Sequence, residues 1–174
     1  MKVPAEIKKC VAFIGAQPDG LDFKPLGTAL FVARDPGSQI YIATAKHVIE
    51  GMKNRGVGRV AIRLNLKNGL AGLMSGSIND WVYHPDETVD IAVRYFAFEH
   101  DYDHKFVPLS LAMTEVVVGN NQIDVGDEVF ITGMFKHHHG KNKNIPIVRV
   151  GNIAAMREEK VQTKDHLMDA YLIE

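Results

Sequence analysis

His47 and Asp90 are the residues of this sequence whose types and surroundings are best suited to chemistry. His47 follows a short apolar segment, residues 40–44, through a small-residue turn, and Asp90 enters a second apolar segment, residues 91–96. A carboxylate among apolar neighbours is costly to bury unless a donor reaches it, and an imidazole N–H is a suitable donor. Each residue alone also has an ordinary structural role, as a core histidine or as a turn aspartate before a strand. Together they predict a hydrogen-bonded histidine–aspartate pair.

Short apolar runs and turn signals predict the strands that must position this pair. Residues 59–66 alternate apolar and other side chains, which predicts a half-buried strand, and Asn68-Gly69 predicts a tight hairpin turn after it. The segment after His47 leaves room for at most one helical turn. Six strands of a first barrel are predicted over residues 9–15, 28–34, 39–44, 59–66, 70–77 and 91–96, and three further strands over residues 126–133, 146–156 and 168–173.

Three segments, in their order, residue types and spacing, resemble the trypsin-like (chymotrypsin-fold) serine peptidases over roughly residues 9–173. They are Gly27-Thr28-Ala29-Leu30-Phe31-Val32, then Thr44-Ala45-Lys46-His47-Val48, then His84-Pro85-Asp86 followed by Asp90-Ile91-Ala92-Val93. The resemblance implies an all-β, two-barrel fold. It places a complete six-stranded N-terminal barrel carrying His47 and Asp90 in residues 1–105. Residues 106–174 are then a linker and a second barrel truncated after about three strands.

The nucleophile of that family is absent from the sequence. The family serine lies in a Gly-Asn/Asp-Ser-Gly-Gly-Pro-like loop, whereas the serines here precede the expected position and lack its glycine frame; they are Ser38, Ser75, Ser77 and Ser110. The resemblance therefore implies a serine endopeptidase lineage in which His47 is the general base and Asp90 orients it. The chain is expected to end before the serine and the oxyanion loop, and to be inactive alone.

Two alternatives are open at this stage. One is a non-catalytic pseudo-peptidase that binds peptide or protein. The other is a metal-binding β domain that uses His100, His104 and His137–His139. The spacing of these histidines matches no standard ligand pattern, and three consecutive histidines cannot all point one way on an extended backbone. No metal ion and no cofactor is therefore predicted.

Composition limits the remaining function classes. The 174 residues carry a formal net charge of −1, which creates no field to attract nucleic acid or an anionic membrane. Cys10 is the single cysteine, so an intramolecular disulfide cannot form. With no N-terminal apolar segment and no long apolar run, a cytoplasmic protein is expected.

A peptide or protein substrate is the expected partner, and self-association through the incomplete second barrel is a further possibility. A partly exposed apolar patch is predicted there from the residues Val129, Ile131, Ile147, Val148, Ile153 and Leu172.

Overall fold

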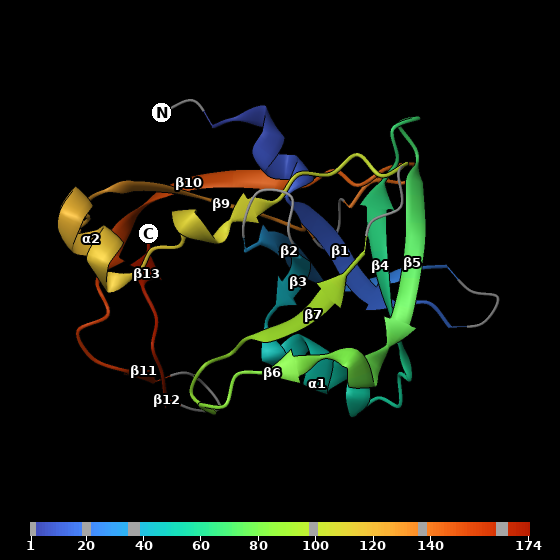
Figure 1. The fold of residues 1–174 in the computed structure, drawn as a ribbon, viewed down its shortest axis with the longest axis horizontal. Helices are drawn as coiled ribbons and strands as arrows, with labels where there is room; N and C mark the ends of the chain where they lie inside the picture. Colours follow the sequence, from blue (N-terminus) through green and yellow to red (C-terminus); the bar gives the residue numbers. More distant parts are fainter. Residues whose placement is uncertain (1–2, 19–21, 35–38, 98–100, 136–138, 163–166) are drawn as a thin grey trace.

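β-Strands are the predominant secondary structure in the computed structural model, which describes residues 3–18, 22–34, 39–97, 101–135, 139–162 and 167–174 (Figure 1). The larger sheet has the strand order β5-β4-β1-β2-β3-β7-β6, and β8 pairs in parallel with β2. Its strands are β1 (Val11–Ala16), β2 (Lys24–Ala33), β3 (Ile40–Thr44), β4 (Arg59–Asn65), β5 (Ala71–Ser77), β6 (Val82–Tyr83), β7 (Ala92–Phe96) and β8 (Val107–Pro108). The six predicted strands of the first barrel are present, and β6 and β8 add to them.

The larger sheet curls until its outer strands approach each other. A Cβ atom added to Gly76 of β5 would lie 2.0 Å from Nη1 of Arg94 on β7, so the guanidinium lies directly against this glycine. Arg94 also forms an ion pair with Asp80 at 3.4 Å. The predicted domain boundary after residue 105 stays a prediction; β8, just beyond it, adds to the larger sheet.

A continuous apolar core fills the inside of the curl. Phe31 is fully buried and its ring lies 5.5 Å from that of Phe96. The helix α1 (Lys46–Lys53) closes one end, since Ile49 and Met52 are fully buried on one of its faces. The expected limit of one helical turn is therefore wrong, because two apolar residues at helical spacing are both accommodated by the core. The largest buried side chains are Phe13, Phe31, Ile14, Ile42, Ile49, Met52, Ile62 and Val60.

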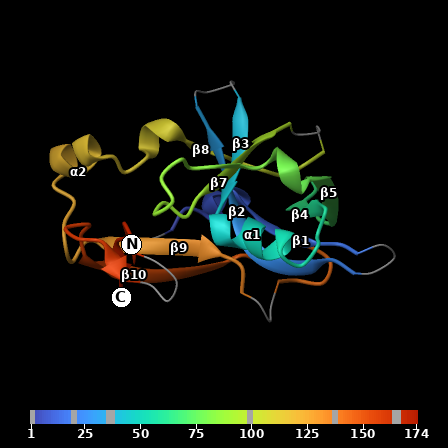
Figure 2. The same cartoon turned by 90° about the horizontal axis from the view of Figure 1, so that it is seen from below.

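The second half of the chain forms a three-stranded sheet of order β13-β10-β9 and a separate hairpin of β11 and β12. Figure 2 shows β9 and β10 side by side along one side of the larger sheet. The strand expected over residues 168–173 is two strands, because the chain changes pairing partner between them. The elements are β9 (Glu128–Gly133), β10 (Ile147–Ala155), β11 (Val161–Gln162), β12 (Leu167–Met168) and β13 (Leu172–Ile173).

Helices occupy part of the connection between the two halves. The helix α2 (Glu115–Asn121) was not expected from the sequence; the Thr114 hydroxyl accepts a hydrogen bond from the Val117 N–H at its start. Short 3₁₀ helices span Ala5–Lys9, Ile78–Asp80 and Leu109–Leu111.

Among the described residues, no helix has the length and apolar character that a membrane span needs.

The loop after β9 fastens onto β4 by polar contacts. Arg63 donates hydrogen bonds to the carbonyl oxygens of Gly140 and Lys141 at 2.9 and 2.8 Å. The Asn65 side chain exchanges two hydrogen bonds with the backbone of Asn144. The half-buried strand predicted here is therefore buried on both faces, since this loop covers the face that solvent was expected to occupy.

The predicted apolar patch of the second sheet is exposed only in part. Ile131 and Leu172 keep 54% and 45% of their surface in solvent. Ile153 is only 2% exposed, so its place in the patch is wrong. The physical reason is that β13 pairs directly beside it, with Ile173 opposite Ile153.

We expect Gly15→Ala to destabilise the fold by about 1–3 kcal/mol, the usual cost of overpacking a tight site. The pairing of β1 with β2 shifts register at this glycine, and an added Cβ would lie 2.0 Å from the Lys24 carbonyl oxygen, which is backbone and cannot move aside alone. The matched control is Gly51→Ala in α1, where no atom lies within 4 Å; it should stabilise by about 0.5–1 kcal/mol. Urea denaturation of both variants checks the pair, and equal effects would contradict it.

Candidate functional site

The pairing of β3 with β7 brings the two candidate residues together. Thr44, the last residue of β3, lies opposite Ala92, the first residue of β7. His47 follows Thr44 by less than one helical turn, on the first turn of α1, and Asp90 lies just before Ala92. Two segments distant in the sequence therefore meet at one end of the sheet.

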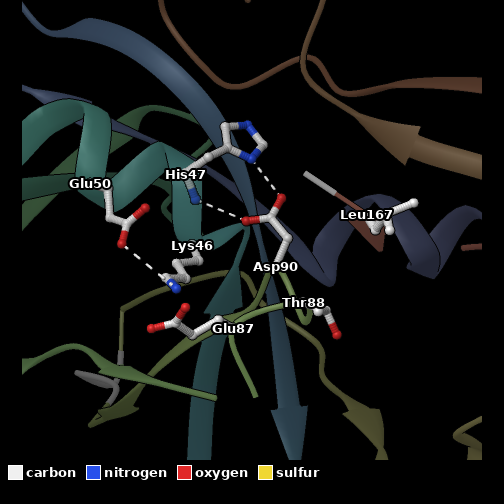
Figure 3. A pocket seen from close by; sticks show the side chains of 7 residues that line it. All are labelled: Lys46, His47, Glu50, Glu87, Thr88, Asp90 and Leu167. Carbon is white, nitrogen blue, oxygen red and sulfur yellow. Dashed lines mark hydrogen bonds and ion pairs between the residues drawn. The ribbon is translucent and has the colours of Figure 1, made fainter. Parts of the chain in front are cut away.

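Asp90 holds His47 through two hydrogen bonds (Figure 3). Its Oδ2 lies 2.6 Å from Nδ1 of the imidazole, and its Oδ1 accepts the backbone N–H of His47 at 2.9 Å. An ionised carboxylate can only accept, so Nδ1 carries the proton and Nε2 has the free lone pair. The Asp90 side chain is 15% exposed and the His47 side chain 69% exposed. The arrangement presents a proton acceptor to solvent while its orienting carboxylate stays sheltered.

Asp90 also caps the start of α1. The N-cap residue is Ala45, which has no side-chain hydrogen bond to offer. The carboxylate of Asp90 satisfies one of the backbone N–H groups that a helix leaves unpaired at its start, and its negative charge lies at the positive end of the helix. One side chain thus fixes both the helix and the imidazole.

The loop before Asp90 is ordered by a second carboxylate. Oδ1 of Asp86 accepts hydrogen bonds from the hydroxyl and the backbone N–H of Thr88, at 2.7 and 2.8 Å. The hydroxyl hydrogen bond, followed by that from the backbone, lowers the pKa of Asp86 below its usual value. Nδ1 of His84 accepts the N–H of Asp86 at 3.1 Å. Trp81, which precedes this loop, is buried in the core, and Tyr83 is partly buried against it.

Two pockets flank His47, and it lines both. The first, of about 350 Å³, is here called the acidic pocket; Figure 3 shows its side chains, from Lys46, His47, Glu50, Glu87, Thr88, Asp90 and Leu167. The second, of about 520 Å³, is called the basic pocket and is lined by Lys24, Pro25, Leu26, His47, Val48, Gly51, Arg55 and Met134. The charged residues of both pockets, apart from Asp90, were missed from the sequence. The only sequence signal that could have identified any of them is the spacing of Lys46 and Glu50, since residues four apart on a helix can form an ion pair.

Among the described residues, no serine or cysteine lines either pocket. Ser75 and Ser77 lie on β5, where their hydroxyl oxygens accept hydrogen bonds from Arg59 and from the N–H of Asn79. Ser110 lies in the 3₁₀ helix Leu109–Leu111. Ser38 falls outside the described residues.

An open apolar groove of about 540 Å³ extends from Asp90 between the larger sheet and β9. Strand β9 contributes Phe130 and Thr132 to its wall, and the larger sheet and its connections contribute the rest. Its other lining residues are Ile7, Val11, Thr28, Ala29, Leu30, Ala43, Thr44, Ala45, Ile91 and Val107. The groove offers apolar surface next to the histidine–aspartate pair.

The histidines of the metal hypothesis are only partly described. His100, His137 and His138 lie outside the described residues. The ring of His104 lies against Phe31, with centroids 6.4 Å apart, and burial is the main cause that lowers its pKa. His139 lies edge-on to Phe13 at 6.5 Å. In the described ranges, no three histidine, cysteine or acidic side chains are placed to hold a metal ion.

Comparison with known proteins places this geometry in a known fold. The structure is similar to the crystal structure of Deg5, a trypsin-like protease, with a TM-score of 0.56 and 18% sequence identity. The match covers 88% of this chain and 61% of the Deg5 chain, less than two thirds of its length. No family model and no curated protein matches the sequence. The chain therefore has the all-β, trypsin-like protease fold that the sequence predicted.

We expect Asp90→Ala to destabilise the protein by about 1–2 kcal/mol, because α1 loses its only cap from a side chain among the described residues. Asp90→Asn should retain most of the stability, since its amide oxygen can still accept the N–H of His47. Its amide nitrogen would, however, donate to Nδ1 and move the ring proton to Nε2. Urea denaturation checks the first effect and imidazole ¹⁵N NMR the second. An unchanged ring tautomer in Asp90→Asn would contradict the assigned geometry.

Thr88→Val should raise the pKa of Asp86 toward its ordinary value, because the hydroxyl hydrogen bond that stabilises the carboxylate is lost. In the unsubstituted chain the folded-state pKa is the lower one. The stabilisation is therefore present above the unfolded pKa and is lost as the pH falls through the folded value. Carboxyl ¹³C NMR titration measures the shift. Thr114→Val, which removes a helix cap elsewhere, is the control and should leave Asp86 unchanged.

Proposed function

We propose that His47 and Asp90 are the general base and the orienting carboxylate of a trypsin-like serine endopeptidase. The observation that supports this most directly is the 2.6 Å contact between Nδ1 of His47 and Oδ2 of Asp90, in a histidine whose side chain is 69% exposed. The similarity to Deg5 supplies the fold in which such a pair has a use. The pair is two parts of a three-part catalytic apparatus.

The two residues would act in sequence during peptide hydrolysis. Nε2 of His47 takes the proton from an attacking serine hydroxyl and then gives it to the leaving amine. Asp90 keeps the proton on Nδ1 and stabilises the imidazolium that forms between these steps. In the acyl-enzyme stage, His47 activates a water molecule in the same way. Backbone N–H groups that hold the developing oxyanion would contribute about 3 kcal/mol each.

The serine and the oxyanion donors would then come from polypeptide other than these 174 residues. In the part of the chain that the structure describes, the two pockets beside His47 have no serine or cysteine in their walls. Thr88 of the acidic pocket is bonded to Asp86 through its hydroxyl and is not placed on the imidazole. The chain by itself is therefore expected to lack peptidase activity.

A pseudo-peptidase that binds peptide or protein without cleaving it is the second candidate. The apolar groove beside Asp90 favours it, because a surface of this size and character needs no catalytic residue to bind an extended apolar segment. The two candidates differ in whether the polypeptide encoded with this chain supplies a serine.

The decisive experiment compares the 174-residue chain with the longest polypeptide that its gene encodes, using a library of fluorogenic peptides. We expect no hydrolysis by the short chain and measurable hydrolysis by the longer one. In the longer polypeptide, His47→Ala should abolish turnover, and Asp90→Asn should lower kcat by about 10⁴-fold. Asp101→Asn, a carboxylate of the connecting loop, is the control and should leave kcat unchanged.

Hydrolysis by the purified short chain that depends on His47 would contradict the proposal. A full-length product without a nucleophile would favour the pseudo-peptidase.

A further inference from the structure

The two pockets beside His47 carry opposite charge. The acidic pocket contains three carboxylates, of Glu50, Glu87 and Asp90, and one lysine, Lys46. The basic pocket contains Lys24 and Arg55, and no acidic residue of the described ranges lines it. Because His47 lines both, the sign of the charge changes across a single side chain.

The acidic pocket keeps a net negative charge, because its three carboxylates outnumber the two cations beside them, Lys46 and Lys160; Nζ of Lys160 donates to the hydroxyl of the lining residue Thr88 at 3.3 Å. Asp90 is committed to His47. Nζ of Lys46 lies 3.8 Å from the carboxylate of Glu50 (Figure 3). The same ammonium group lies over the ring of Tyr83, so it neutralises at most one carboxylate. The negative charge of Glu50 reaches its neighbours, since it adds to burial in raising the pKa of Tyr83. Glu87 is exposed at the rim of the same pocket.

The basic pocket keeps its positive charge. Lys24 begins β2 and Arg55 follows α1, so the two cations come from separate elements and meet beside the imidazole. Within the part of the chain that the structure describes, neither takes part in an ion pair. Leu26, Val48 and Met134 line the same pocket and offer apolar contact to the stem of an entering side chain.

We propose that this site selects a peptide with a basic side chain for the acidic pocket and an acidic side chain for the basic pocket, on opposite sides of the bond presented to His47. The inference rests on the proposed function: because His47 lines both pockets, a substrate that presents its peptide bond to this imidazole lies next to both of them. Charges of opposite sign on one chain would then match both pockets at once. A peptide with the two charges in the reverse order would place an acidic side chain in the acidic pocket and a basic side chain in the basic pocket, so both contacts would be repulsive.

The expected discrimination follows from the exposure of these charges. An ion pair between exposed side chains changes a dissociation constant by about two- to fivefold, and less at high salt. Two matched pairs should therefore favour the preferred charge order over the reverse by roughly tenfold at low ionic strength. The preference should shrink when salt is added.

The test is an NMR titration of the ¹⁵N-labelled 174-residue chain with octapeptides of identical composition. One carries two lysines in its N-terminal half and two glutamates in its C-terminal half, and the other has the reverse order. We expect one order to shift the amide signals of His47 and Gly51 with roughly tenfold lower Kd. In Lys24→Glu/Arg55→Glu the preference should disappear, and a peptide with four lysines should bind best. Lys8→Glu/Lys143→Glu makes the same charge change outside both pockets and should leave the preference intact.

Equal affinity for the two orders would overturn the inference, as would an absence of shifts at millimolar peptide. Loss of the preference in Lys8→Glu/Lys143→Glu would also overturn it, because net charge rather than the pockets would then be responsible. The outcome is separate from that of the hydrolysis experiment. Hydrolysis that depends on His47 but ignores charge order removes only the inference. Charge-ordered binding without hydrolysis in the longest polypeptide removes only the proposed function.

Discussion

The carboxylate of Asp90 lies where the start of α1 meets the start of β7. It accepts one hydrogen bond from the backbone N–H of His47 and one from the imidazole of the same residue. Because the backbone N–H of His47 is one of these donors, the position of α1 is tied to the strand that follows Asp90. Because the imidazole is the other, the ring cannot rotate freely although most of it is in solvent. The start of α1, whose N-cap residue offers no side-chain hydrogen bond, is therefore held by Asp90 in a fixed position together with the exposed imidazole of His47.

This contact depends on the register between β3 and β7. Thr44 opposite Ala92 sets the distance between the two segments that carry the site. A slip of one residue by either strand would turn its own fully buried residue, Ile42 on β3 or Ala92 on β7, out of the core. The cost of exposing them protects the register. Ile49 and Met52 add a second restraint, since they hold the opposite face of α1 in the same core. The chemistry of the site is thus positioned by hydrophobic packing that lies beneath it.

The surroundings of His47 come from parts of the chain that are distant in sequence. Met134 reaches the basic pocket because its N–H donates to the hydroxyl of Thr28 at 2.8 Å, and the loop beyond it is fastened by Arg63. Leu167 reaches the acidic pocket from the hairpin of β11 and β12. The larger sheet supplies the histidine–aspartate pair, while the second half of the chain contributes to the walls on both sides of it.

The sequence by itself determined most strands through local patterns, and it predicted the histidine–aspartate pair through a resemblance that spans most of the chain. Alternation over residues 59–66 predicted β4, and Asn68-Gly69 predicted the turn after it, where Gly69 has a φ of 84°. The spacing of three motifs predicted that His47 and Asp90 belong to one site. Only the tertiary structure decided that Asp90 also caps α1, that this helix has two turns, and that charges of opposite sign flank the histidine. The reason is physical: periodicity and turn chemistry act between near neighbours, whereas caps, buried faces and pocket walls arise from contacts between distant segments, which local patterns do not encode.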